Sequence, residues 1–578
     1  MIAESNFVET AVKHMAKKTN WFEEAVVYQI YPLSYMDGNN DGIGDIPGII
    51  SKLDYIKDLG ATAIWFSPLY ASPWKDYGYD ISDYRAIHPA FGTMEDFDRL
   101  MEECRKRGLR VIMDMVLNHT SDQHAWFREA ISDPNSKYRD YYIIRPGRRR
   151  GDKLLPPTNW VSCFTGSAWA RIDGTDDFYL HLFAPEQPDL NWENPAVRDE
   201  IVDIMRFWLE KGVSGFRFDV FNLYSKVYPL RDDRSVFRMQ KGSGFFVDGP
   251  RMHEFLRELN TRALSDFDTY TVGESYMPDP EHAHRYIKRE SGELDSIFDF
   301  AHLTSDNLFG LKFIPKPFSL LRFKLGLLGP QMRYFATGWN TLVLENHDCP
   351  RSVSRFGIDT KHYRYEAATF LALITFMGWG TPFIYQGEEI GMTNADFKAM
   401  DELKDPVSRF VFDTMTENFH IPRGLAFRLI RCGARDHART PMQWDDTVNA
   451  GFNAGAEPWQ CLNAAYPNIN VRRDMDSERS IYRFYQELLA FRRTNPIALR
   501  GETRLHLPKS RRMLVYSREL DGRRLLIVGN FSNRSRRFRL PFGFEARRLK
   551  VRLTNYEKQL PRPEMTLRPY EAIVFEEV

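Results

Sequence analysis

Acids and histidines follow four short apolar runs in this sequence of 578 residues. One run contains Asp114 and is followed by His119, and the next contains Arg217 and Asp219. A further run ends with Glu274, and another is followed by His347 and Asp348. Two carboxyl groups that face one pocket are the minimum equipment for hydrolysis of a glycosidic bond. A single aspartate at a strand end is more often a helix cap or an ion-pair partner, so the inference rests on the whole set.

Eight apolar runs alternate with helical patterns and have the composition of strands that are buried on both faces. They span residues 25–31, 61–68, 109–117, 213–220, 270–274, 294–300, 341–346 and 382–386. This alternation predicts an α/β fold whose parallel sheet closes as a (β/α)8 TIM barrel. The carboxyl ends of barrel strands share one face, so the fold would bring the acids and histidines together.

Two regions interrupt the alternation. Residues 118–187 are rich in turn residues and aromatics, which predicts a B domain inserted after the third strand. Short strand-like runs near the end of the chain predict a C-terminal antiparallel β domain. The expected organisation is an N-terminal extension (1–20), barrel domain A in two parts (21–117 and 188–500), domain B (118–187) and the C-terminal domain (501–578).

Composition disfavours several classes of protein. Lys plus Arg and Asp plus Glu each total 78, so no net charge favours nucleic acid or an anionic membrane. The longest apolar run, residues 367–385, is divided by Gly378, Gly380 and Pro382, which favours a buried helix, turn and strand over a membrane span. Five scattered cysteines and the absence of a secretion signal in the first twenty residues favour a cytoplasmic protein. We expect a monomer or a weak oligomer.

Four sequence blocks resemble the signature regions of the α-amylase superfamily, glycoside hydrolase family 13. The blocks are Asp114-Met-Val-Leu-Asn-His119, Gly215-Phe-Arg-Phe-Asp219, Gly273-Glu274 and Asn346-His-Asp348. Similar blocks at residues 42–45, 187–192 and 380–389 occur in the expected order. The resemblance covers the chain from about residue 21 to the last strand. It implies a barrel with an inserted B domain and a β C domain, and a small oligosaccharide as substrate.

The resemblance implies that Asp219 is the nucleophile, that Glu274 is the general acid and then the base, and that Asp348 holds sugar hydroxyls in the distorted transition state. Glu274 must hold a proton for the leaving oxygen while Asp219 stays ionised. Arg217 lies two residues before Asp219, on the same strand face, and is suited to keep it charged. His119 and His347 are expected to donate to ring hydroxyls, although a buried histidine can also be a satisfied core residue.

Further positions that resemble the family concern the shape of the pocket. Asp76 would grip the terminal glucose and Tyr79 would stack beneath it, which closes the pocket and favours exo-action on short substrates. Phe164, Phe183 and Arg351 resemble other residues that line the pocket.

Val220, directly after the nucleophile, resembles the oligo-1,6-glucosidase branch, and its branched side chain would favour the flexible α-1,6 linkage. We therefore expect a retaining exo-α-glucosidase that acts on isomaltose and similar oligosaccharides. An α-1,4-glucosidase or transglucosidase stays open. Trehalose-6-phosphate hydrolase is also open, because residues 248–251 resemble that enzyme and Lys226, Arg231 and Arg234 could bind a phosphate. Non-catalytic partners of amino-acid transporters are a remote alternative, since all three carboxylates are present and no membrane span is visible.

A loop after the first strand carries oxygen ligands at alternate positions. Its candidate ligands are Asp37, Asn39, Asp41, the carbonyl of Ile43, and Asp45. Gly42 stands at the sixth place of an EF-hand pattern, although Gly48 replaces the glutamate of the twelfth. Alternate Asp and Asn also make good turns. Because the resembling branch binds calcium or magnesium in the matching loop, we expect a structural ion of this kind and no organic cofactor.

Overall fold

The computed structural model describes residues 18–235, 240–277, 280–308 and 311–578. Its centre is an eight-stranded sheet with the order β13-β12-β11-β5-β2-β1-β17-β16, in which neighbours pair in parallel. The strands are β1 (Val27–Ile30), β2 (Ala63–Phe66), β5 (Arg110–Met115), β11 (Gly215–Phe218), β12 (Tyr270–Glu274), β13 (Ser296–Phe298), β16 (Thr341–Val343) and β17 (Thr381–Tyr385). The two outer strands meet where Thr341 Oγ1 donates to the carbonyl of Ile297 at 3.0 Å, so the sheet is a nearly closed barrel. The predicted fold class is confirmed.

The register between β11 and β5 places two of the predicted site residues next to each other. Arg217 on β11 pairs with Asp114 on β5, so the two side chains leave neighbouring strands at the same height. The strands are buried along nearly their whole length, because one side faces the barrel interior and the other faces helices.

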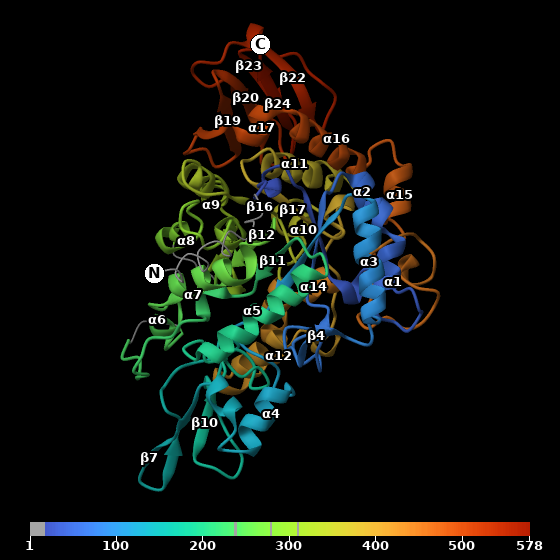
Figure 1. The fold of residues 1–578 in the computed structure, drawn as a ribbon. Helices are drawn as coiled ribbons and strands as arrows, with labels where there is room; N and C mark the ends of the chain where they lie inside the picture. The colour runs from blue at the N-terminus through green and yellow to red at the C-terminus, as the bar shows by residue number, and fades with distance from the viewer. Residues whose placement is uncertain (1–17, 236–239, 278–279, 309–310) are drawn as a thin grey trace, which may run out of the picture.

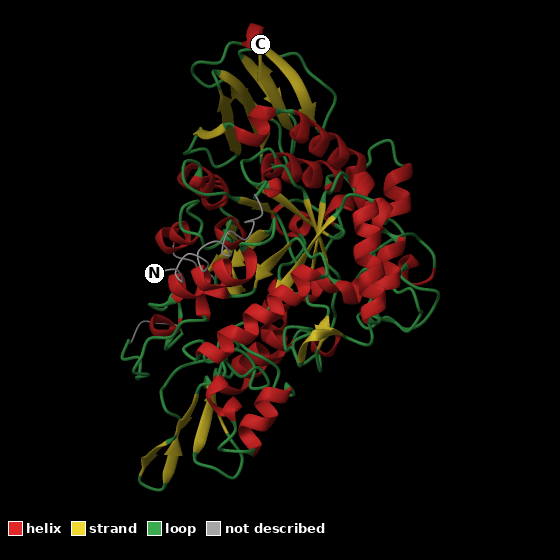
Figure 2. Ribbon diagram, in the orientation of Figure 1, coloured by secondary structure: helices red, strands yellow, loops and turns green. Residues whose placement is uncertain are grey.

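Helices surround the barrel strands (Figures 1 and 2). Helix α3 (Met94–Lys106) begins with a capping box formed by Thr93 and Asp96, and α5 (Pro195–Glu210) begins with the side chain of Asn194 as its cap. Threonine and asparagine are favoured at this position, because their side-chain oxygens accept free N–H groups of the first helical turn. Other helices around the barrel are α1 (Ile46–Ser51), α2 (Leu53–Leu59), α7 (Met252–Leu259), α9 (Leu320–Tyr334), α10 (Ser352–Phe356) and α16 (Ile481–Thr494).

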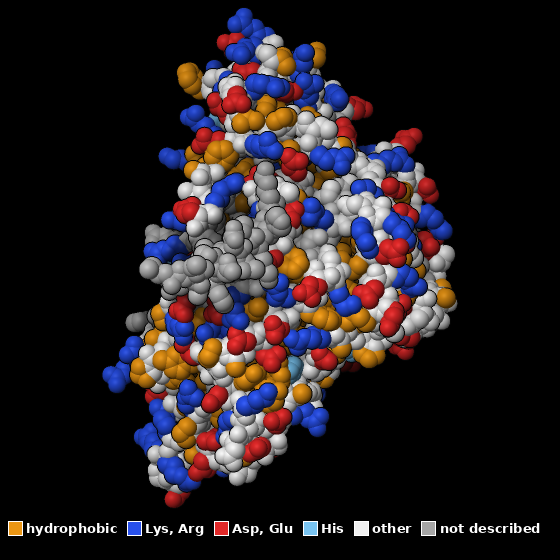
Figure 3. Space-filling model, viewed as in Figure 1, with side chains coloured by type: hydrophobic (Ala, Val, Ile, Leu, Met, Phe, Trp, Pro, Cys, Tyr) orange, Lys and Arg blue, Asp and Glu red, His pale blue; other side chains and the backbone are white. Residues whose placement is uncertain are grey.

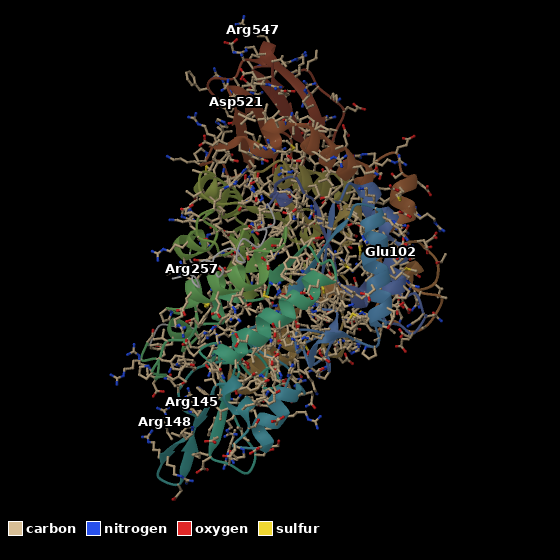
Figure 4. All side chains as sticks on the ribbon, viewed as in Figure 1. Glu102, Arg145, Arg148, Arg257, Asp521 and Arg547 are labelled. Atoms are coloured by element: carbon tan, nitrogen blue, oxygen red, sulfur yellow. The ribbon has the colours of Figure 1, made fainter. Side chains whose placement is uncertain are left out.

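Between β5 and β11 the chain forms α4 (Ala125–Ser132), a three-stranded sheet and a hairpin. The sheet has the order β6-β10-β9, and its strands are β6 (Ile144–Pro146), β9 (Trp169–Arg171) and β10 (Asp177–Leu180). The hairpin pairs β7 (Arg148–Arg150) with β8 (Lys153–Leu155), and the labels of Arg145 and Arg148 in Figure 4 mark this end of the molecule.

The last part of the chain forms a five-stranded antiparallel sheet with the order β18-β19-β20-β24-β22. Its strands are β18 (Glu502–His506), β19 (Met513–Leu520), β20 (Arg523–Asn530), β22 (Leu549–Thr554) and β24 (Ala572–Glu577), and a smaller pair joins β21 (Arg536–Arg539) to β23 (Glu564–Leu567). Asp521 and Gly522 turn β19 into β20 with φ of 50° and 73°, as an Asp-Gly hairpin requires. This confirms the C-terminal antiparallel β domain, whereas the domain boundaries stay predictions.

The longest apolar run forms α11 (Arg364–Phe376), a turn and β17, as its glycines and proline indicate. Every residue of this helix from Glu366 onward is buried. Within the described ranges, no helix is both long and apolar enough to cross a membrane. Figure 3 shows basic and acidic side chains mixed over the visible face, in keeping with the balanced charge. The predicted extension 1–20 falls mostly outside the described residues.

Candidate active site

Arg217 is the centre of the candidate site. Its Nη1 lies 2.7 Å from Asp114 Oδ1 and 2.6 Å from Asp219 Oδ1, and its Nη2 contacts Glu274 Oε2. Three carboxylates from β5, β11 and β12 therefore share one buried guanidinium. Burial would lower the pKa of Arg217, but Asp114 and Asp219 outweigh it and raise the pKa above its ordinary value. This cation therefore stays charged beside the three acids.

The chain turns sharply directly after Asp219. Val220 has a left-handed φ of 37°, which is unusual for a β-branched residue and indicates local backbone strain. Such strain is found where surrounding structure fixes a functional side chain, and Val220 is itself 8% exposed beside the carboxylate. The turn leaves the Asp219 side chain at the barrel mouth.

Asp348 lies between two arginines that the sequence analysis did not single out. Arg439 Nη2 and Arg435 Nε are 2.9 Å and 3.0 Å from its Oδ1. Burial would raise the pKa of Asp348, but Arg435 and Arg439 hold it well below the ordinary value. This carboxylate is therefore ionised throughout the physiological range. Arg439 is the last residue of α14 (Asp436–Arg439) and lies ninety-one residues after Asp348 in the chain, so no local pattern could have revealed the contact.

A hydrogen-bonded relay crosses the base of the site. Gln29 Nε2 lies 2.8 Å from His347 Nδ1, His347 Nε2 lies 2.8 Å from Tyr79 Oη, and Tyr79 Oη lies 3.1 Å from Asp114 Oδ2. The assignment that satisfies every atom has Gln29 donating to Nδ1, Nε2 donating to Tyr79, and Tyr79 donating to Asp114. Burial lowers the pKa of His347 to about 3, so the ring is neutral. The Tyr79 and His347 rings stack at 5.4 Å, which fixes both.

Asp76 lies on the other side of the site. Gln187 Nε2 donates to its Oδ2 at 3.3 Å, and Arg435 Nη1 lies 3.9 Å from its Oδ1. Oδ1 is buried and has no hydrogen-bond partner among the described residues. Burial raises the pKa of Asp76 to about 7, although Arg435 and Arg439 oppose the shift. An acceptor oxygen left open inside a polar pocket is suited to receive a hydroxyl group of a ligand.

His119 and two phenylalanines form the adjoining wall. His119 Nε2 lies 3.0 Å from the carbonyl of Tyr79, and burial lowers the pKa of its ring. Phe183 packs on His119 with 5.1 Å between ring centroids and on Phe164 with 5.4 Å. Both phenylalanines also line a cavity of about 380 Å³ between the inserted sheet and residues 410–418. The aromatic wall therefore separates the carboxylates from this neighbouring cavity.

Arg351 and Lys226, which were candidates for contact with a ligand, are both buried and paired with other groups of the protein. Arg351 is wholly buried, and its Nη1 donates to the carbonyl of Gln386 at 2.7 Å and pairs with Glu345 at 3.5 Å. Its guanidinium is thus bound by protein groups, and its role in lining the pocket stays a prediction. Lys226, considered for a phosphate site, is buried with its Nζ 2.8 Å from Asp189. Its charge is neutralised inside the protein, so it is not available to a ligand.

The predicted metal loop is compact, and its oxygens accept hydrogen bonds within the loop. Asp37 accepts the backbone N–H groups of Asn40 and Gly42 at 2.6 Å and 2.8 Å, and Asp45 accepts that of Gly48 as the cap of α1. Asn39 Oδ1 accepts from the N–H of Asp41 at 2.9 Å, and the N–H of Ile43 donates to Asp41. Over the described residues, no group of three or more His, Cys, Asp or Glu is arranged to hold a metal ion.

A (β/α)8 barrel with several carboxylates at the carboxyl ends of its strands defines the class of the protein as a glycoside hydrolase. The family model "Alpha amylase, catalytic domain" matches residues 29–501. The chain belongs to the α-amylase family, glycoside hydrolase family 13.

Named relatives match almost the whole chain. An oligo-1,6-glucosidase of Parageobacillus thermoglucosidasius is 44% identical over 96% of this chain and 98% of its own length. A trehalose-6-phosphate hydrolase of Bacillus subtilis is 42% identical over 97% of this chain and 98% of its own. Among solved structures, isomaltulose synthase from Klebsiella sp. LX3 is 39% identical with a TM-score of 0.91, covering 96% of this chain and 99% of that one. The fold is thus shared by enzymes with different named substrates.

Proposed function

We propose that this protein is a retaining, exo-acting α-glucosidase that hydrolyses α-1,6 bonds of short oligosaccharides such as isomaltose. The observation that carries the proposal is the arrangement around Arg217, where Asp219 and Glu274 contact one guanidinium from adjacent strands. Two carboxylates held this close suit a covalent intermediate, because retaining enzymes need their acids nearer together than inverting enzymes do.

In the proposed reaction, ionised Asp219 attacks the anomeric carbon while Glu274 gives its proton to the leaving oxygen. Glu274, now ionised, then removes a proton from water, which attacks the same carbon and releases glucose with its α configuration. The positive charge of Arg217 lies beside both acids, and it opposes the protonation that Glu274 needs. The negative charges of Asp219 and Asp114 on the same guanidinium weaken that opposition.

The terminal glucose would lie between Asp76 and Asp348. The open Oδ1 of Asp76 would accept a hydroxyl, and Asp348, held ionised by Arg435 and Arg439, would accept another as the ring distorts. Tyr79 and Phe183 would supply ring faces for the sugar, with the two predicted histidines, His119 and His347, beside them. A terminal glucose held between Asp76 and Asp348 in this way would favour exo-action.

Val220 beside the nucleophile and the similarity to oligo-1,6-glucosidases support the α-1,6 linkage. Trehalose-6-phosphate hydrolase is the second candidate, because relatives of that name are 42% identical to this chain. A phosphate would need cations at the site of the leaving sugar. Lys226 is paired with Asp189, which leaves only the exposed Arg231 and Arg234 of the three candidates.

A substrate panel tests the proposal. Isomaltose, maltose, sucrose, trehalose and trehalose 6-phosphate are compared by kcat/KM, and isomaltose is expected to be the best. Faster turnover of trehalose 6-phosphate would select the second candidate. Proton NMR of the first glucose released is expected to show the α anomer, and initial β-glucose would exclude a retaining mechanism.

We further propose that the loop of residues 37–45 binds a structural calcium ion. Its candidate ligands, Asp37, Asn39, Asp41, the Ile43 carbonyl and Asp45, are all oxygens, the donor type that calcium prefers. Burial raises the pKa of Asp45, and the nearby charge of Asp37 adds to the shift. A cation beside these carboxylates would relieve both effects. The ion would stabilise the fold and take no part in the chemistry, and we propose no organic cofactor.

The balanced charge and the five free cysteines support a cytoplasmic enzyme that functions as a monomer or a weak oligomer without nucleic acid or membrane partners. Light scattering across a concentration series measures the oligomeric state.

A further inference from the structure

The two strands that carry the nucleophile and the acid are not paired with each other at the level of these residues. The ladder between β11 and β12 ends with Phe218 opposite Gly273. Beyond that point the N–H of Asp219 donates to Met115 on β5, and Glu274 pairs with Phe298 on β13. The main chains of Asp219 and Glu274 are therefore each held by the neighbour on the far side.

One buried side chain joins the two strands again just beyond the acids. Asn222 Oδ1 accepts the backbone N–H of Tyr276 at 2.8 Å, and Asn222 Nδ2 donates to the carbonyl of Tyr276 at 2.9 Å. Asn222 is 1% exposed. It follows Asp219 by three residues, and Tyr276 follows Glu274 by two. The amide binds both backbone polar groups of one residue, as a hydrogen-bonded pair in an antiparallel ladder does, and so joins two segments that the parallel ladder no longer connects.

Both ends of this bridge are anchored. The N–H of Asp248 donates to the carbonyl of Asn222 at 2.8 Å, and Tyr286 donates to the carboxylate of Asp248 at 2.9 Å. On the other side, Tyr276 Oη donates to Gln240 at 2.5 Å. Because each loop is also held by other hydrogen bonds, the bridge fixes the distance between the two loops.

We propose that Asn222 is a positioning residue that fixes the main-chain separation of Asp219 and Glu274. Arg217 holds the carboxylate oxygens of the two acids, whereas Asn222 sets where their backbones lie. An amide is the side chain that both donates and accepts at this spacing, so neither a carboxylate nor a methyl group replaces it. The proposal rests on the assignment of Asp219 as nucleophile and Glu274 as acid.

The test compares a glucoside that needs protonation with one that does not. Asn222→Ala lets Glu274 shift away from the leaving oxygen, so kcat/KM for isomaltose is expected to fall about tenfold to a hundredfold, as for misplacements of roughly 1 Å. A nitrophenyl α-glucoside has a good leaving group and needs little help from the acid. Its kcat/KM is expected to fall by less than about threefold. The isosteric Asn222→Asp retains the acceptor for Tyr276 and is expected to shift the same ratio by a smaller factor.

Asn555→Ala is the matched control. Asn555 is also buried, donates to the carbonyl of Tyr570 at 2.8 Å and accepts from the N–H of Ala572 at 2.9 Å, but it directly follows β22 in the C-terminal part of the chain. It is expected to lower the melting temperature and leave the ratio of the two kcat/KM values unchanged. Equal losses on both glucosides in the Asn222 variants, or no loss, would overturn the proposal. If the wild-type enzyme prefers another glucoside to isomaltose, the ratio is measured with that substrate, so an error in the proposed specificity is seen separately.

Discussion

One guanidinium, that of Arg217, forms ion pairs with Asp114, Asp219 and Glu274. The charge of each of these acids therefore affects how strongly Arg217 attracts the other two. Burial raises the pKa of Asp114 to about 7, with Arg217 opposing and Asp219 adding to the shift. A change at any one acid therefore redistributes the attraction of Arg217 among the others. Removing a negative charge from this group strengthens the hold of Arg217 on the acids that remain.

Asp219→Asn is expected to abolish most turnover for two reasons. The amide cannot attack the anomeric carbon, and loss of its charge leaves Arg217 freer to keep Glu274 ionised. Glu274→Gln is expected to lose about as much on isomaltose, since no proton reaches the leaving oxygen. Steady-state assays and thermal melts of both variants provide the measurement. Wild-type activity in a folded Asp219→Asn variant would refute the mechanism.

Asp76 gives a prediction that depends on pH. Its folded pKa of about 7 lies above the ordinary value for an aspartate, so the folded state favours the protonated form. The resulting stabilisation is complete at low pH and is lost as the pH rises through about 7. Asp76→Asn removes this loss. Its melting temperature relative to the wild type is expected to be several degrees higher at about pH 8.5 than at about pH 5. A difference that does not vary with pH would contradict the raised pKa.

At the residue scale, the sequence revealed the acids but not the groups that hold them. Asp114, Asp219 and Glu274 end apolar runs, and parallel strands bring such ends together. Arg439 reaches Asp348 across ninety-one positions of sequence, and Asn222 reaches Tyr276 across fifty-four. No local periodicity encodes such contacts. The prediction that Arg351 lines the pocket came from resemblance to the family, and it stays a prediction.

At the scale of elements, the signals that can be read from a sequence are local ones. The caps of α3 and α5 stand next to the helices they begin, and Asp521-Gly522 determines its hairpin by backbone preference alone. The short strands β7 and β8 were not predicted individually. Their residues are mostly exposed and basic, so they lack the alternation of apolar and polar residues by which a strand is recognised.

The loop between β1 and α1 is the element that the calcium proposal concerns. If it binds calcium, adding the ion should raise the melting temperature, because a ligand that binds only the folded state stabilises it. Turnover should change little, since the loop contains none of the three acids that we propose to be catalytic. Asp41→Ala removes a carboxylate that does not cap α1 and is expected to lose the calcium-dependent shift. The same shift in wild type and variant would show that the ion binds elsewhere.

At the scale of the whole molecule, the C-terminal sheet completes the burial of α11. One side of this helix packs on the barrel, and the other lies against β20 and β24 (Figure 1). Tyr516 Oη donates to the carbonyl of Ile374 at 3.0 Å, and Asn555 Nδ2 donates to that of Glu366 at 3.1 Å. Phe370 also packs on Phe531 with 5.0 Å between ring centroids. An apolar helix that resembles a membrane span in sequence is thus covered on both sides by protein.

Gly529 allows this close contact, and it gives a test of whether the sheet stabilises the barrel. A Cβ atom at Gly529 would lie 2.7 Å from the Phe370 ring and 3.1 Å from Ile374 Cγ2. Gly529→Ala should therefore push β20 away from α11 and cost about 1–3 kcal/mol, the usual range for an overpacked core. Thermal unfolding is expected to occur several degrees lower, while kcat at 25 °C stays near the wild-type value because the active site is at the other end of the strands.

Gly424→Ala is the control for this substitution. Gly424 lies in α13 (Arg423–Gly433), and a Cβ atom there has nothing within 4 Å. Alanine also restricts the unfolded chain more than glycine does, so this variant is expected to be as stable as the wild type or slightly more stable. If Gly529→Ala unfolded at the same temperature as Gly424→Ala, the contact between β20 and α11 would be too loose to stabilise the barrel. A drop in melting temperature confined to Gly529→Ala, with a single unfolding transition in both variants, would instead show that the C-terminal sheet and the barrel unfold as one cooperative unit.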